Sequence, residues 1–437
     1  MKNCAKHYLL SLKREIGRMA ETPNQYAKSS VFFTRKRKID FQSTVSFVLA
    51  SAGKSLSNEL LQFFSCKSTC PTPSAFIQQR NKLSETVFKK LFHSFSKSNI
   101  PNCTFKGYRL LAVDGSSLCT PPNPADQDSY FPAVNGKKHF NLLHIHALYD
   151  ILSHTYVDAI VEGGQVFNER SAFNQLVDRS DIQKAIVIAD RGYEAFNTFA
   201  HCMVKGWKFL IRVKDATSGA VVTNLPLPDC EDFDAPVSLV LGRSRTKQAR
   251  SIPNYKPLAS NTVFDCFPAS SEDGKEIQTF EMNFRVVRFR ISEDCFETVI
   301  TNLPADQFPA DMVKRLYSAR WGIETSFRYL KKNIGLELVH AKKVESILHE
   351  IFARLIIYNF TALIAYQTSI RENIGKYRYK PSFTNAVLIC RHLFLGKISP
   401  PEAEACIARC LIPIRPNRSI PRRSSAKHPA CFNHRLA

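Results

Sequence analysis

The chain has 437 residues, of which 44% are hydrophobic and 22% are charged, so it can bury a large core and is not a disordered chain. This length is typical of about two to four domains. The longest apolar run, residues 351–366, falls short of the roughly 18 residues that span a bilayer, and it contains Arg354 and Asn359. The N-terminus lacks the features of a signal peptide. We expect a soluble, intracellular protein with no membrane partner.

Positive charge is concentrated at the two ends of the chain. Residues 1–100 hold 17 Lys and Arg against 5 Asp and Glu, and residues 366–437 hold 13 against 3. Residues 101–365 hold 30 of each sign and are neutral. Basic flanks of this size favour a polyanion partner, above all nucleic acid, because each neutralised phosphate releases a counterion. The alternative is that the flanks only aid solubility.

The 13 cysteines are scattered along the chain. Without a secretory signal, we interpret them as free thiols that behave as small core residues. Two pairs have short spacing, Cys66 with Cys70 and Cys406 with Cys410, but neither has the spacing and histidine partners of a zinc site. The cysteine pattern therefore predicts neither disulfides nor a structural zinc.

Residues 1–104 are predicted to form a helical, basic DNA-binding domain. Apolar residues recur at helical spacing over 42–65 and again over 74–95, and a Pro-containing break separates the two segments. A run of four basic residues at 35–38 precedes them. The pattern is compatible with a helix-turn-helix type of DNA binder, although that motif itself is not legible.

Short strands alternate with helices over residues 105–213, and the order is β-β-β-α-β-α-β. The run at 184–190 is short, apolar and β-branched, which is typical of a buried central strand. The other predicted strands are 107–115, 139–151, 154–162 and 207–213, and the predicted helices are 169–179 and 194–206. This segment is predicted to be the first part of an α/β core.

Residues 214–300 break the alternation with many prolines and strand-like pieces, and they are predicted to be a β-rich insertion. The core then continues over 301–366. Its predicted helices are a long one at 309–333 and a very apolar one at 344–366. Residues 367–437 are predicted to be a basic C-terminal region, irregular from 411 onward because it is rich in Pro, Arg and Ser.

The helix predicted at 309–333 carries four polar side chains on one stripe. Tyr317, Arg320, Glu324 and Lys331 stand at offsets 0, 3, 7 and 14, and at roughly 100° per residue they fall within about 60° of one another. The alternative is an ordinary solvated face, on which Arg320 and Glu324 form a pair worth about 0.3 kcal/mol.

Two aspartates follow predicted strands, Asp114 after LLAV and Asp190 after AIVIA. Taken singly, each could simply open a turn. In an open α/β sheet they would share the edge where sites form, and Glu324 beside them would complete a cluster of three carboxylates. Such a cluster calls for hard divalent cations, and two of these support phosphoryl transfer. The cations of Arg320 and Lys331 suit a phosphodiester.

These residues resemble those of DDE transposases of the insertion-sequence-four type. The four residues of the helix stripe follow the spacing Y-x2-R-x3-E-x6-K, which is similar to that family's signature. Asp114 in VDGSSL and Asp190 in ADRGY look like its first and second catalytic aspartates, and Tyr193 stands at its D-x2-Y spacing. A β-rich insertion before the glutamate is a family trait as well. The resemblance covers about 105–365 and implies a ribonuclease-H-like mixed sheet.

The resemblance implies an endonuclease and strand-transfer reaction on double-stranded DNA. The protein would nick transposon ends and join the freed 3′-hydroxyls to target DNA, as a homodimer in a synaptic complex in the bacterial cytoplasm, associated with the nucleoid. The cofactor would be two Mg²⁺ ions, with Mn²⁺ as a substitute. The catalytic, metal-binding residues would be Asp114, Asp190 and Glu324. The DNA-binding residues would be Tyr193, Tyr317, Arg320 and Lys331.

Two other functions stay open. One is a catalytically silent DNA-binding regulator derived from a transposase, although decay usually removes a carboxylate and all three are present. The other is a structure-specific nuclease, whose cleavage would not depend on terminal repeats. Relatives that cut through a hairpin stack a flipped base on an aromatic residue of the insertion, often Trp. Here Trp207 and Trp321 lie outside the insertion, which leaves Phe296 as the candidate.

Overall fold

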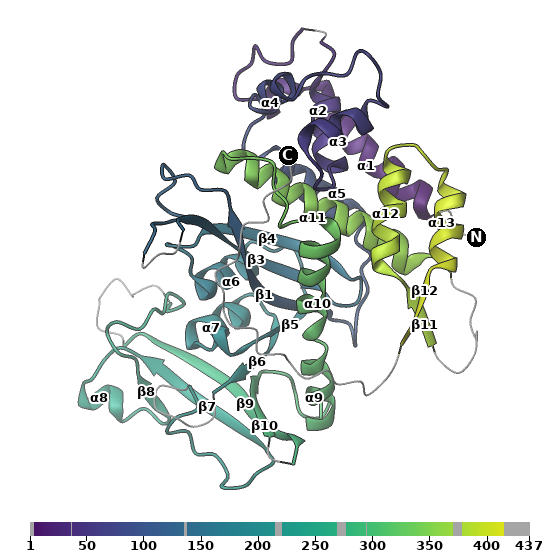
Figure 1. Ribbon diagram of the computed structural model, residues 1–437. Coiled ribbons are helices and arrows are strands. Elements are labelled where there is room, and N and C mark those ends of the chain that lie inside the picture. Colours follow the sequence, from purple (N-terminus) through teal and green to yellow (C-terminus); the bar gives the residue numbers. More distant parts are fainter. Residues whose placement is uncertain are drawn as a thin grey trace.

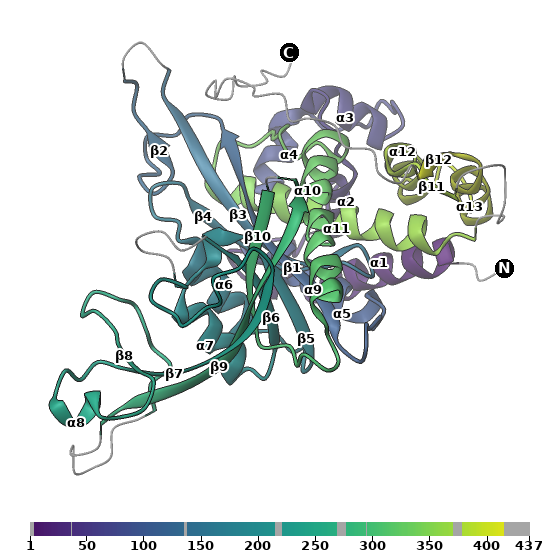
Figure 2. The same cartoon turned by 90° about the horizontal axis from the view of Figure 1, so that it is seen from below.

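A mixed sheet of ten strands runs through the molecule, and helices cover both of its faces (Figure 1). The computed structural model describes residues 4–35, 37–134, 138–214, 221–268, 277–293, 295–369 and 378–414. Seen from below, α6 and α7 lie on one side of the sheet, and α5, α9, α10 and α11 lie on the other (Figure 2). The molecule is therefore an α/β protein with a layered core, as the sequence predicts.

The first half of the sheet has the strand order β4-β3-β1-β5-β6. Strands β4, β3 and β1 are antiparallel neighbours, whereas β5 and β6 run parallel to β1. Their bounds are β1 Arg109–Thr120, β3 Phe140–Asp150, β4 Thr155–Gly163, β5 Ala185–Ala189 and β6 Lys208–Val213, and the short β2, Tyr130–Phe131, pairs with the start of β3. All five residues of β5 are fully buried, as expected of a β-branched central strand.

The predicted β-rich insertion supplies the other half of the same sheet. Strand β10 pairs antiparallel with β6, and β9, β7 and β8 follow it in order. Their bounds are β7 Phe233–Gly242, β8 Tyr255–Pro257, β9 Thr279–Ser292 and β10 Cys295–Thr301, and the one-turn helix α8 is Lys247–Arg250. The insertion is thus an extension of the central sheet, held by continuous backbone hydrogen bonds.

Two helices, α6 (Glu169–Asp178) and α7 (Phe196–Val204), cover the face of the sheet next to the insertion. The short 3-10 turn η2, Arg191–Tyr193, connects the end of β5 to α7. Their apolar side chains join one core cluster with those of β5, β6 and β7. The helices predicted at 169–179 and 194–206 are confirmed within a few residues.

The N-terminal segment is helical, as predicted, but it is more divided than its apolar pattern indicates. The helices are α1 Cys4–Glu21, α2 Phe41–Ala50, α3 Leu56–Phe63, α4 Pro73–Arg80 and α5 Val87–Asn99, with a 3-10 turn η1 at Pro23–Tyr26. The single helix predicted over 42–65 is wrong, because Gly53 interrupts it with φ of +101°. A Cβ at Gly53 would lie 2.5 Å from Leu338 Cδ1, so only glycine fits this turn.

Helix α11, Val344–Gln367, is the central helix of this face. It is the one helix of the described ranges that is long and apolar enough to cross a membrane, but 94% of its most apolar window is buried inside the protein. The two polar residues that interrupt it bond to neighbours. Arg354 donates to the carbonyl of Ser51, and Asn359 bonds both backbone groups of Tyr156 on β4 at 2.7 Å. Helix α11 is therefore a core helix, fastened to α2 and the sheet.

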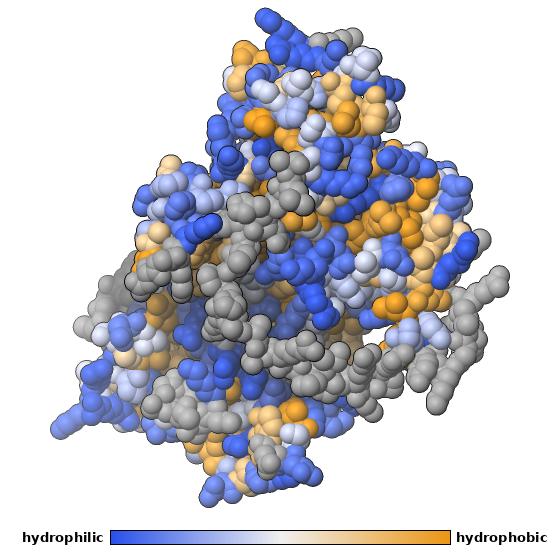
Figure 3. All heavy atoms as spheres, in the orientation of Figure 1, coloured by the Kyte–Doolittle hydropathy of each residue, from blue (hydrophilic) through white to orange (hydrophobic). Residues whose placement is uncertain are grey.

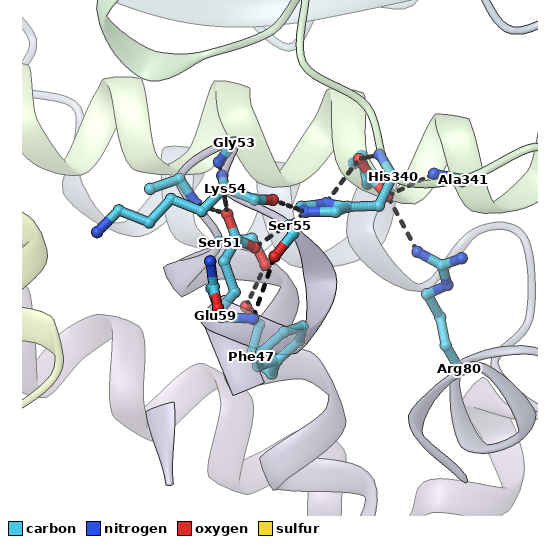
Figure 4. A network of polar contacts seen from close by, with 12 residues as sticks. Phe47, Ser51, Gly53, Lys54, Ser55, Glu59, Arg80, His340 and Ala341 are labelled. Carbon is cyan, nitrogen blue, oxygen red and sulfur yellow. Dashed lines mark hydrogen bonds and ion pairs between the residues drawn. The ribbon is translucent and has the colours of Figure 1, made fainter. Parts of the chain in front are cut away.

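A buried network of charged groups joins the N-terminal helices to α11 (Figure 4). Glu59 on α3 accepts the backbone N–H groups of residues 52–54, and its other oxygen lies 3.2 Å from His340 Nε2. Arg80 on α4 lies 3.0 Å from Glu350 on α11, with both side chains almost fully buried. Each charge thus has a partner, which offsets the cost of burying it.

The C-terminal part folds back onto α11 through two more helices. These are α12 Phe383–Phe394 and α13 Pro400–Arg409, and a small antiparallel pair of strands, β11 Arg378–Pro381 and β12 Leu411–Ile414, flanks them. The tail predicted to be irregular from 411 therefore begins with a strand. Its remainder, 415–437, lies outside the described residues.

Candidate active site

Strand pairing places the first two predicted aspartates on neighbouring strands. The parallel register of β1 and β5 pairs Val113 with Ala189. Asp114 directly follows Val113, and Asp190 directly follows Ala189, the last residue of β5. Each carboxylate accepts a hydrogen bond from the following backbone N–H, at 2.9 Å for Asp114 and 2.7 Å for Asp190. The prediction that this strand ends directly after Asp114 is wrong, because β1 continues to Thr120 in its pairing with β3.

The third carboxylate comes from a helix that is less regular than predicted. Residues 309–333 form two helices, α9 Ala310–Ser318 and α10 Trp321–Tyr329, and a π-helical turn, η3, at Leu330–Ile334. Between α9 and α10 the backbone bonds tighten to i→i+3, for example from Arg320 N to Tyr317 O at 3.1 Å. The prediction of one uniform helix is therefore wrong, and a constant 100° per residue does not hold for Lys331. Such π turns are often found at functional sites.

Arg320 lies within the carboxylate cluster. Its side chain is 6% exposed, and its Nη2 lies 2.8 Å from Glu324 Oε1. Burial opposes its charge, yet the phenol of Tyr317 and the carboxylates of Asp190, Glu324 and Asp114 raise the pKa of Arg320. The alternative of an ordinary solvated face therefore does not hold for Arg320. Its guanidinium instead balances the negative charge of all three predicted catalytic residues.

The carboxyl group of Asp114 is strongly affected by its surroundings. Burial raises its pKa to about 6, while the hydrogen bond from Gly115 and the charge of Arg320 act in the opposite direction. Glu324 and Asp190 contribute further to the rise, because like charges disfavour ionisation. The three carboxylates therefore act on one another electrostatically, as members of one site do.

Two tyrosines with buried hydroxyl groups line the cluster. Tyr193 is 2% exposed and Tyr317 is 4% exposed, and within the described part of the chain neither hydroxyl oxygen has a hydrogen-bond partner. Burial raises the pKa of Tyr317 to about 12, with Asp190 adding to the rise. Burial and the charge of Asp114 likewise raise the pKa of Tyr193 well above its usual value. Both phenols are neutral donors beside the carboxylates.

Lys331 reaches the same strand farther along. Its ammonium group donates a hydrogen bond of 2.8 Å to the carbonyl of Ser117 on β1. The hydroxyl of Ser117 lies 3.2 Å from His144 Nδ1, and a Cβ at Gly115 would lie only 2.4 Å from His144 Nε2. The glycine after Asp114 is therefore required by the close approach of the His144 ring.

A fourth acidic side chain, Glu169, borders the site, although no motif in the sequence points to it. Its Oε1 lies 3.7 Å from His144 Nε2, and its Oε2 lies 2.9 Å from the position of a Cβ on Gly192. Burial and the charge of Asp190 raise the pKa of Glu169. The sequence carries no signal for it, because a glutamate in the first turn of a helix is common.

The donor set of the cluster fits a divalent cation, since carboxylate oxygens are the ligands that Mg²⁺ prefers. The three carboxylates do not point at one common metal position, because Glu324 pairs with Arg320. Among the described residues, the ligand atoms of three His, Cys, Asp or Glu side chains come within 4.8 Å of one another at another place, formed by His201, Asp265 and Cys266. In the space-filling view, hydrophilic residues gather around α10 (Figure 3).

Comparisons with known proteins place these residues in a family context. A family model described as a transposase DDE domain matches residues 105–360, a segment that contains all three carboxylates. No curated protein matches the chain. One solved structure, the cryo-EM structure of a piggyBac transposase synaptic complex with hairpin DNA, aligns over 94% of this chain and 87% of its own, with 11% identity and a TM-score of 0.46.

Proposed function

We propose, from the premise that this chain belongs to the family of transposase DDE domains, that it nicks transposon ends and joins their 3′-hydroxyls to target DNA. The observation that carries the proposal is the meeting of three carboxylates from distant parts of the chain. Adjacent parallel strands bring Asp114 and Asp190 together, and α10 adds Glu324, whose charge acts on Asp114. No nucleophilic side chain is needed for this chemistry.

The first step of the reaction hydrolyses one phosphodiester bond, and the second step exchanges one phosphodiester bond for another. In the first step water attacks phosphorus, the bond from phosphorus to the 3′-oxygen breaks, and the freed oxygen takes up a proton. In the second step that 3′-hydroxyl loses its proton and attacks a target phosphate, which releases a target 3′-hydroxyl. Asp114, Asp190 and Glu324 would hold two Mg²⁺ ions, with Mn²⁺ as a substitute. Bound there, the ions would supply Lewis-acid stabilisation of the attacking and leaving oxygens.

The cationic and phenolic groups around the cluster would bind and orient DNA. Arg320 would exchange part of its pairing with Glu324 for a phosphate, a geometry that a guanidinium suits well. Lys331 would hold a neighbouring phosphate as a point charge. The unpartnered hydroxyls of Tyr193 and Tyr317 would donate to phosphate oxygens, which removes the cost of leaving them unbonded.

The remaining assignments extend the same proposal. The basic flanks would bind double-stranded DNA, two copies would pair the transposon ends as a homodimer, and the protein would act in the bacterial cytoplasm. The proposed division is 1–104 for DNA binding, 105–213 and 301–366 for the catalytic core, 214–300 for the β insertion and 367–437 for a basic C-terminal region. The hairpin route would use Phe296. The centre of its ring lies 5.0 Å from the guanidinium carbon of Arg288 and 5.2 Å from that of Arg290.

The deciding experiment is end cleavage by isosteric variants of the carboxylates. Asp114→Asn, Asp190→Asn and Glu324→Gln should each abolish cleavage of DNA carrying the element's terminal repeats, while binding of the same DNA persists. Glu337→Gln, which removes an exposed ion pair with Lys332, is the control. Cleavage by any of the three variants at the wild-type rate would refute the proposal. Equal cleavage of DNA without the repeats would instead favour a structure-specific nuclease.

A further inference from the structure

A second cluster of ligand-type side chains lies on the other face of the sheet, away from the three carboxylates. His201 on α7 and the consecutive residues Asp265 and Cys266 each offer one ligand atom, and these atoms all lie within 4.8 Å of one another. Asp265 and Cys266 follow β8 in the β insertion, whereas α7 belongs to the core. The cluster therefore joins the two halves of the sheet through side chains.

The histidine of this cluster is oriented as metal-bound histidines are. His201 Nδ1 lies 2.9 Å from Asp178 Oδ1 at the end of α6, and its Nε2 lies 2.8 Å from Asp265 Oδ1. A carboxylate on one ring nitrogen fixes the tautomer and leaves the other nitrogen for the metal. The side chain of His201 is only 13% exposed, so the ring is held between the two elements.

The segment that carries the other two donors is held in place by protein contacts of its own. Asp265 N donates to Asn197 Oδ1 on α7 at 3.1 Å. The guanidinium of Arg243, just after β7, donates to the carbonyls of Ala259 at 3.2 Å and Thr262 at 2.9 Å. Because these bonds fix the backbone before any ligand binds, little ordering cost remains for the ligand to offset.

We infer that His201, Asp265 and Cys266 form a zinc site that fastens the β insertion to the α6–α7 layer, with Asp178 as the partner that positions His201. Nitrogen, sulfur and carboxylate oxygen are zinc ligands, and at zinc bond lengths they would stand roughly 3.3–3.7 Å apart. Asp265 Oδ1 and Cys266 Sγ are already 3.7 Å apart. Zinc would displace both the proton between His201 and Asp265 and the thiol proton of Cys266, and these protons would pass to solvent.

The chemistry of the donors separates this site from the carboxylate cluster. A thiolate is a soft ligand that Mg²⁺ does not select, whereas zinc and its analogue cobalt bind it well. The carboxylate of Asp265 is 61% exposed, so water has access to a fourth coordination position. His201 is separated from Asp265 and Cys266 by a long stretch of chain. A cross-link that closes a long loop restrains the chain more than one that closes a short loop.

The test is metal binding by the full chain, prepared without metal and carrying Asp114→Asn, Asp190→Asn and Glu324→Gln so that the carboxylate cluster does not contribute. Titration with Co²⁺ should produce the near-ultraviolet thiolate-to-cobalt band, and Zn²⁺ should displace it at one equivalent. Cys266→Ser should abolish the band, and Asp265→Asn should weaken Co²⁺ binding at least tenfold. Cys230→Ser, which alters an exposed cysteine of the same insertion, should leave both unchanged.

Thermal melting supplies a readout that does not depend on the cobalt band. Zn²⁺ should raise the melting temperature of the same protein by a few degrees, and the rise should vanish in Asp265→Asn, which keeps the hydrogen-bonding shape of the side chain. A band that survives Cys266→Ser, or a zinc-induced rise that survives both substitutions, would overturn the inference. The inference would also be overturned if Co²⁺ produced no thiolate-to-cobalt band in protein with His201, Asp265 and Cys266 intact. In that case His201 would only be a hydrogen-bonded residue between Asp178 and Asp265.

Discussion

Arg320 Nη2 lies 2.8 Å from Glu324 Oε1, one turn apart on the helix that delivers the third carboxylate. On an exposed helix such a pair contributes little. Here the guanidinium is buried and is also attracted to Asp114 and Asp190. The same arginine therefore stabilises the fold by neutralising the cluster, and under the proposed function it would also bind a phosphate of the DNA.

Replacing Arg320 by alanine should reduce both stability and activity. The change leaves three partly buried carboxylates without their cation, so the free energy of unfolding should fall by about 1–3 kcal/mol. Mg²⁺ should restore part of this stability, because it supplies the missing positive charge. Melting with and without Mg²⁺ and end cleavage are the measurements.

The control for Arg320 is an i,i+4 pair on the preceding helix, α9. Arg315 lies 2.8 Å from Asp311, and both side chains are about 70% exposed. Arg315→Ala should change the free energy of unfolding by at most a few tenths of a kcal/mol and leave cleavage intact. Equal effects of the two substitutions would return the helix stripe to an ordinary solvated face.

Lys331 and Lys332 provide a matched pair for testing the interaction with DNA. Lys331 is half-buried and bonds to Ser117 on β1, whereas Lys332 is exposed and pairs with Glu337. Lys331→Ala should lower end cleavage roughly ten- to a hundredfold, the effect of removing one charge-assisted hydrogen bond of about 1.5–3 kcal/mol. Lys332→Ala should cleave close to the wild-type rate. A larger loss from Lys332→Ala would contradict the placement of Lys331.

Acid should destabilise the protein through its buried histidines. Burial lowers the pKa of His144, His146 and His349 to about 4, below the ordinary 6.5. The unfolded chain therefore binds more protons between these values, so stability is full above pH 6.5 and is lost as the pH falls toward 4. Each group contributes a slope of at most about 1.4 kcal/mol per pH unit.

A second group extends this loss to lower pH. Burial opposes the ionisation of Glu350, but His340 and Arg80 more than compensate and lower its pKa to about 2, so its contribution is lost as the pH falls from 4.5 toward 2. Urea unfolding at several pH values measures the sum. His349→Gln, which retains a donor for the carbonyl of Ser84, should make the slope above pH 4 shallower. The exposed His392→Gln is the control, and an unchanged slope in His349→Gln would refute this account.

The basic flanks, rather than the neutral middle of the chain, should supply most of the non-specific DNA affinity. A fragment of 101–365 is unsuitable as a test, because α11 packs on α1, α2 and α5 and would lose its cover. Truncation after Ile414 removes six Lys and Arg and no acidic residue. It should make the salt dependence of binding to random duplex shallower, by about 0.9 in slope for each phosphate that the protein no longer neutralises.

The matched control removes positive charge from the middle of the chain instead. Glutamine at the exposed Lys184, Arg245 and Lys247 neutralises three positions in the core and insertion. Glutamine at the exposed Arg35, Arg37 and Lys38 neutralises the same number in the N-terminal flank. The flank variant should bind more weakly at low salt than the core variant. Equal losses would show that the charge asymmetry of the sequence does not determine where DNA binds.

The order of strands and helices along the core part of the chain could be predicted from the sequence, because each element has a local pattern. Apolar, β-branched runs such as 184–190 define buried strands, and the strand patterns at 139–151 and 154–162 correspond to β3 and β4. The charge split is likewise a property of composition alone. The candidate carboxylates Asp114 and Asp190 were legible for the same reason, since each directly follows a recognisable strand pattern.

Tertiary structure alone decided how these pieces meet. The register that sets Asp114 beside Asp190, the burial of Arg320 and the pairing of β10 with β6 are long-range contacts, on which local periodicity carries no information. The π turn at η3 forms the last turn of a helix that by periodicity alone would be a regular α-helix as far as residue 333. His201 and Cys266 are far apart in the sequence and share no motif, so only the packing of the insertion against α7 brings their donor atoms together.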